Sequence, residues 1–121
     1  MGTWGAGIFE DDVAMDVRDS FEAALAEGLN VRSATERVLE EHEEALEDID
    51  EGPVVRLALA ALQLEQGVLQ PGIRDHALTV INQGQDLDRW EEAGEVAVAE
   101  RRRVLEEFAR RLQSASISQG E

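Results

Sequence analysis

The spacing of apolar residues is the feature that most limits what this chain can fold into. Apolar side chains recur every three or four residues in five segments, which glycine or proline separates. This spacing places the apolar side chains of each segment on one face of an α-helix. No segment shows the sustained alternation of a half-buried β-strand. The pattern therefore predicts an all-α domain of about five helices joined by short links.

Start and stop signals set the bounds of the predicted helices. A capping box at Ser33–Glu36 opens the second, Pro53 and Pro71 precede or begin the third and fourth, and glycines end most of them. The last helix is unusually long and contains Gly94, where we expect a kink or a close helix contact. The five predicted helices cover about residues 11–27, 33–51, 54–66, 71–83 and 87–113.

The two ends of the chain have no helical period. Residues 1–10 hold three glycines with Trp4 and Phe9, so the backbone can approach other elements closely while the apolar side chains favour docking. We expect residues 1–10 to form an ordered arm and residues 114–121 a frayed tail. At 121 residues, the chain is expected to be a single domain.

Charge and cysteine content narrow the classes of function. The chain has 27 acidic residues against 11 basic ones, all arginine, giving a net charge of −16. This excess argues against binding to nucleic acid or to an anionic membrane. The absence of cysteine excludes disulfides and cysteine-based metal sites. Without a signal peptide or a long apolar run, we expect a cytoplasmic protein, and no cofactor is indicated.

The acidic residues are concentrated in residues 36–51, where nine of them are opposed by a single arginine, Arg37. On a helix, like charges four residues apart repel by roughly 0.2–0.5 kcal/mol per pair, so tertiary packing must offset the repulsion. One interpretation is a solvated helix face. The other is a docking face for a basic protein partner, formed by Glu40, Glu43, Glu44 and Glu47.

Three smaller groups of polar residues allow a structural and a functional interpretation. The carboxylates at residues 10–12 and Asp16 either cap the first helix or bind a divalent cation. His42 and His76 have no metal ligand one helical turn away, which favours partly buried packing roles over convergence on carboxylates across the fold. The arginines at 101–103 are expected to pair with Glu106 and Glu107 within one helix.

The opening stretch, residues 2–16 with the sequence GTWGAGIFEDDVAMD, resembles the start of the domain of unknown function 4259 family of small, mostly bacterial proteins. Residues 77–90 are also similar to the family. Asp11 stands where asparagine is common in the family, and Val17 where an aromatic residue is frequent. The resemblance implies a shared fold and no particular reaction. The matching residues either dock the arm or border a ligand pocket lined by Trp4, Asp11, Asp12, Asp16 and Trp90.

Together these observations favour a non-enzymatic cytoplasmic interaction domain whose acidic surface binds a basic protein partner, as an inhibitor or immunity-type factor. The alternative is a small hydrolase or a ligand- or metal-binding domain that uses the N-terminal carboxylates. The sequence supports a homodimer and a monomer equally. Either the domain itself or a second copy would cover the apolar strip of Leu105, Phe108 and Leu112 on the last helix.

Overall fold

The computed structural model describes residues 12–49, 51–84 and 94–115, and this part of the chain is helical, as predicted. The predicted arm, Asp11 and Trp90 lie outside the described residues. The last helix is the longest of those described, as expected, with 20 residues. The described helices are α2 (Asp12–Ala26), α3 (Val31–Glu41), α4 (Glu43–Glu47), α5 (Glu51–Gln66), α6 (Pro71–Gln83) and α7 (Glu95–Ser114).

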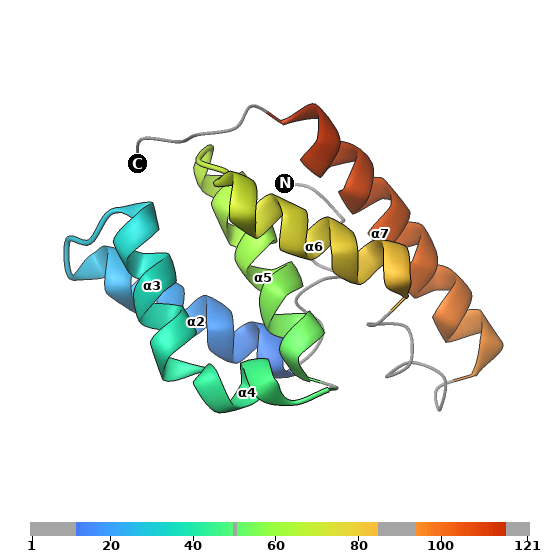
Figure 1. Cartoon of the computed structure of the whole chain (residues 1–121), viewed down its shortest axis with the longest axis horizontal. Helices are drawn as coiled ribbons and strands as arrows, with labels where there is room; N and C mark the ends of the chain where they lie inside the picture. Colours follow the sequence, from blue (N-terminus) through green and yellow to red (C-terminus); the bar gives the residue numbers. More distant parts are fainter. Residues whose placement is uncertain (1–11, 50, 85–93, 116–121) are drawn as a thin grey trace.

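Helix α5 lies at the centre of the molecule. It contacts α2, α3, α4 and α6, and α7 packs against α6 on the far side from α3 (Figure 1). Most residues of α5 are buried, including Leu57 and Leu59, because its sequence is apolar on nearly all sides. Of the described helices, α5 has the largest number of buried residues. None of the helices in the described ranges is long and apolar enough to cross a membrane.

The glycine stop signals are confirmed where the chain turns sharply. Gly84 forms the C-cap of α6 with a φ angle of 68°, and Gly67 follows α5 with a φ angle of 74°. Residues with a Cβ atom rarely adopt this left-handed conformation, so glycine sets where both helices end.

The predicted second helix is broken and begins earlier than expected. It starts at Val31, after Asn30, whose side-chain Oδ1 accepts a hydrogen bond from the Ser33 N–H at 2.8 Å. The Ser33–Glu36 capping box is therefore wrong, because Asn30 already supplies the cap. At His42 the helix ends and α4 begins. Helix α5 begins at Glu51, ahead of the expected start.

Helix α7 differs from the prediction at its start. Gly94 is the N-cap of α7, with a φ angle of 102°, so the expected kink inside a helix is wrong. A Cβ atom built on Gly94 meets nothing within 4 Å among the described residues, so the alternative of a close helix contact is not found there either. Leu105, Phe108 and Leu112 are each at most 2% exposed within the single chain. The apolar strip is thus covered by the domain itself, and these three side chains do not require a second copy.

Candidate functional site

The acidic face, which we define as Glu40, Glu43, Glu44 and Glu47, lies at the end of α3 and along α4. All four residues are exposed. Within the described part of the chain, none of the four forms an ion pair with an arginine. Their negative charge is therefore left without neutralisation by the residues around them.

In contrast to the acidic face, acidic residues on neighbouring surfaces form ion pairs with arginines. Arg37, the single arginine of the acidic segment, pairs at 3.1 Å with Glu27, the residue that follows α2. Arg32 pairs with Glu36 at 3.7 Å, one turn before the acidic face begins. Arg32 and Arg37 are thus engaged with other carboxylates, which leaves the excess charge on α4 and the end of α3.

An exposed apolar side chain lies beside the acidic face. Ile49 lies two residues after the end of α4 and is 89% exposed, whereas most large apolar side chains of the described residues are buried or half-buried. It borders a shallow cavity of about 430 Å³, formed where α4 meets α5. The lining of this cavity includes Leu46, Glu47 and Pro53. This surface therefore combines negative charge with an exposed apolar side chain.

Of the N-terminal carboxylates, only Asp12 and Asp16 lie in the described part of the chain. Asp12 and Asp16 are exposed on α2. No group of three or more metal-ligating side chains is placed to hold an ion among the described residues. Asp12 occupies the first turn of α2, where the helix dipole stabilises a negative charge. The predicted positions Trp4, Asp11 and Trp90 lie outside the described residues.

The histidines and the arginine cluster have roles that the sequence predicted only in part. His42 is half-buried, and its Nε2 atom lies 3.0 Å from Ser20 Oγ on α2, which confirms a packing role. His76 is exposed, so that prediction is wrong for this residue. The arginines at 101–103 also differ from expectation. Arg101 is only 4% exposed, and in the described ranges the exposed pair at 102–103 forms no ion pair with the glutamates at 106–107.

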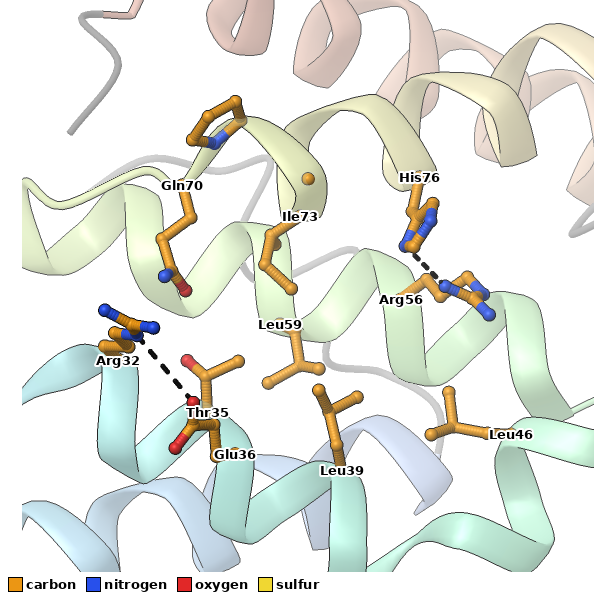
Figure 2. Close-up of a pocket in the computed structure, with 12 residues that line it drawn as sticks. Arg32, Thr35, Glu36, Leu39, Leu46, Arg56, Leu59, Gln70, Ile73 and His76 are labelled. Carbon is orange, nitrogen blue, oxygen red and sulfur yellow. Dashed lines mark hydrogen bonds and ion pairs between the residues drawn. The ribbon is translucent and has the colours of Figure 1, made fainter. Parts of the chain in front are cut away.

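A groove between α3 on one side and α5 and α6 on the other is the largest of the cavities described, with a volume of about 550 Å³. Figure 2 shows Arg32 and Glu36 toward one end of the groove and Arg56 with His76 toward the other. Apolar side chains lie between them and include Leu39, Leu59 and Ile73. The volume is in the range of small-molecule sites. The sequence predictions missed this groove, because its lining comes from four helices.

A buried polar network supports one end of the groove. Gln63 is fully buried on α5, and its Nε2 atom donates to Thr35 Oγ1 and to Gln70 Oε1, both at 2.9 Å. Its Oε1 atom accepts a hydrogen bond from the backbone N–H of Gln70, also at 2.9 Å. Thr35 in turn donates to the backbone oxygen of Val31. These bonds connect α3, α5 and the start of α6, and so fix two of the groove's lining residues.

These features define an all-α domain that carries an exposed acidic face and a separate groove. The chain belongs to the family described as Domain of unknown function (DUF4259), whose model matches residues 2–118. The resemblance seen in the opening residues is thereby confirmed. No curated protein and no solved structure matches the chain.

Proposed function

We propose that this protein is a non-enzymatic cytoplasmic interaction domain whose acidic face binds a basic protein partner, as an inhibitor or immunity-type factor does. The observation that carries the proposal is the exposure of Glu40, Glu43, Glu44 and Glu47 without an arginine partner in the described part of the chain. Concentrated charge of one sign accelerates encounters with a partner of opposite charge and selects against partners of like charge.

The neighbouring Ile49 supports the proposal from a different direction. Charge alone gives an on-rate and an orientation, whereas a stable interface also needs apolar contacts near its centre. Ile49 is almost fully exposed and lies two residues after the end of α4. A basic partner with an apolar residue among its cationic side chains would cover Ile49 while pairing with the surrounding glutamates.

A charge-reversal experiment tests the proposal. In the face variant, Glu40, Glu43, Glu44 and Glu47 are each changed to lysine. The matched control changes the same number of exposed acidic residues outside the acidic face, namely Asp19, Glu95, Glu100 and Glu106, to lysine. Both variants alter the net charge equally, so a difference between them reports on the position of the charge. Circular dichroism confirms that each variant remains folded.

Each tagged protein is used to capture partners from lysate of the source organism, with elution between about 0.1 and 1 M salt, where screening weakens charge attraction. We expect the wild type and the control variant to retain a stoichiometric basic protein that salt releases. The face variant should lose it, because repulsion replaces attraction. Equal capture of that protein by the face variant, or no basic protein captured by the wild type, would contradict the proposal.

A further inference from the structure

Arg56 is an unusual cation in a chain with such an excess of acidic residues. It is half-buried on α5, and in the described part of the chain no carboxylate lies within ion-pair distance of it. The other half-buried arginines, at positions 18, 37 and 74, each pair with a glutamate or an aspartate. A guanidinium partly removed from water without an anion is unfavourable unless something compensates its charge.

The hydrogen bond to His76 orients Arg56 without neutralising it. The Nη1 atom of Arg56 lies 2.6 Å from Nδ1 of His76. Because a guanidinium can only donate hydrogen bonds, Nδ1 of His76 is the acceptor in this bond. This bond uses one of the five N–H donors of Arg56 and leaves the others for an anion.

The surroundings of Arg56 define what kind of anion fits. Arg56 lines the groove, whose middle part is apolar and includes Leu39, Leu59 and Ile73 (Figure 2). Gln70, the N-cap of α6, also lines the groove but lies on the side of Arg32, away from Arg56 (Figure 2), so the positive end of this helix does not contribute to an anion site at Arg56.

We propose that this groove binds an amphipathic organic monocarboxylate. The carboxylate accepts hydrogen bonds from the guanidinium of Arg56, and the hydrocarbon body covers Leu39, Leu59 and Ile73. A planar carboxylate matches the fork of the guanidinium donors. A single negative charge suits a protein of net charge −16 better than a phosphate dianion does. Glu36 toward the other end of the groove disfavours a second anionic group on the ligand.

The probe is octanoate, which combines a carboxylate with an eight-carbon body. Isothermal titration calorimetry on the full chain measures its affinity beside those of 1-octanol and octylammonium, which share the hydrocarbon body. We expect saturable binding of one octanoate per chain, and at least about tenfold weaker binding of the other two probes. A tenfold weaker affinity is the effect expected when the charge-assisted hydrogen bonds between the carboxylate and Arg56 are lost.

Two variants of equal charge change locate the carboxylate. Arg56→Gln removes the proposed anchor and should weaken octanoate binding about tenfold or more. Arg103→Gln removes an exposed arginine on α7 and should leave the affinity within about twofold of the wild type. The acidic-face variant should bind octanoate at least as tightly as the wild type, because it retains the groove. Failure of the acidic-face proposal is therefore distinguishable from failure of this one.

A measurement on the wild type covers the case in which Arg56→Gln does not fold. The Nε–H resonance of Arg56 in a ¹H–¹⁵N NMR spectrum should shift with octanoate and not with 1-octanol. The proposal is overturned if octanoate shows no saturable binding, if 1-octanol binds as tightly, or if the Arg56 resonance does not respond to octanoate. Equal octanoate affinity of a folded Arg56→Gln variant overturns it as well.

Discussion

At the scale of single residues, polar side chains inside this protein are as informative as the apolar core. Gln63 is fully buried, yet both its amide hydrogens and its carbonyl oxygen have partners on other segments. A buried polar group of this kind contributes little net stability while its bonds are intact. Removing it is costly because the partner groups then lose their hydrogen bonds without regaining water.

Replacing Gln63 with leucine should lower the free energy of unfolding by about 1–3 kcal/mol, since the N–H of Gln70 loses its acceptor. Gln66→Leu is the matched control, because Gln66 is exposed on the same helix; its effect should stay within about 0.5 kcal/mol. Urea unfolding of both variants measures the difference. Similar stabilities for the two variants would show that the buried hydrogen bonds contribute nothing.

Sequence patterns indicate such residues and leave their partners undetermined. Arg56 and Gln63 interrupt a nearly continuous apolar stretch, which marks both as unusual. Their partners, His76 and Thr35, lie 20 and 28 residues away in the sequence. Which side chains meet depends on how α3, α5 and α6 cross, and that crossing has no local signal. The groove was therefore missed, whereas the exposed acidic face was expected from local charge alone.

At the scale of elements, local signals predicted the helix ends better than the helix breaks. The ends of α2, α5 and α6 agree closely with the expected bounds, because a left-handed glycine follows each of them. The break at His42 was not predicted, since the apolar spacing continues through it. Its cause is tertiary: His42 is hydrogen-bonded to Ser20 on α2, while α4 packs against α5.

Gly52 is the residue that allows α4 and α5 to approach closely. A Cβ atom at Gly52 would lie 2.6 Å from the backbone oxygen of Leu46. Gly52→Ala should therefore lower the free energy of unfolding by about 1–3 kcal/mol, as overpacking does. Gly72→Ala, where the added atom meets nothing, should leave it unchanged or raise it by up to about 1 kcal/mol.

Thermal unfolding followed by circular dichroism compares the two alanine variants under the same conditions. The prediction concerns their difference, which removes the general effect of replacing glycine by alanine in a helix. If Gly52→Ala were as stable as Gly72→Ala, the close contact between α4 and α5 would be refuted.

At the scale of the whole molecule, repulsion among acidic residues opposes folding. The net charge is −16, and the ion pairs described join side chains that are largely exposed, so each contributes little. Compaction brings the unneutralised carboxylates closer together than in the unfolded chain. The free energy of unfolding should therefore increase with ionic strength, because salt screens the repulsion.

Raising NaCl from about 0.01 M to about 0.15 M shortens the screening length from about 30 Å to about 8 Å. We expect the Tm to rise, by roughly 4 °C for each kcal/mol of repulsion removed. A variant with glutamine in place of all four glutamates of the acidic face should begin with a higher Tm and gain less from salt. A Tm that falls with added salt would mean that attractive ion pairs outweigh the repulsion.

The apolar character of α5 on nearly all sides has a consequence for the uniqueness of the fold. A helix with apolar side chains on all faces can rotate about its axis, or shift along it by one turn, with little loss of hydrophobic burial. The hydrogen bonds of Gln63 to Thr35 and Gln70 are directional and form at one rotation only. Gln63 thus fixes the rotation and the axial position of α5. Through its bonds to Thr35 and Gln70 it also fixes how α3 and α6 are aligned across the groove.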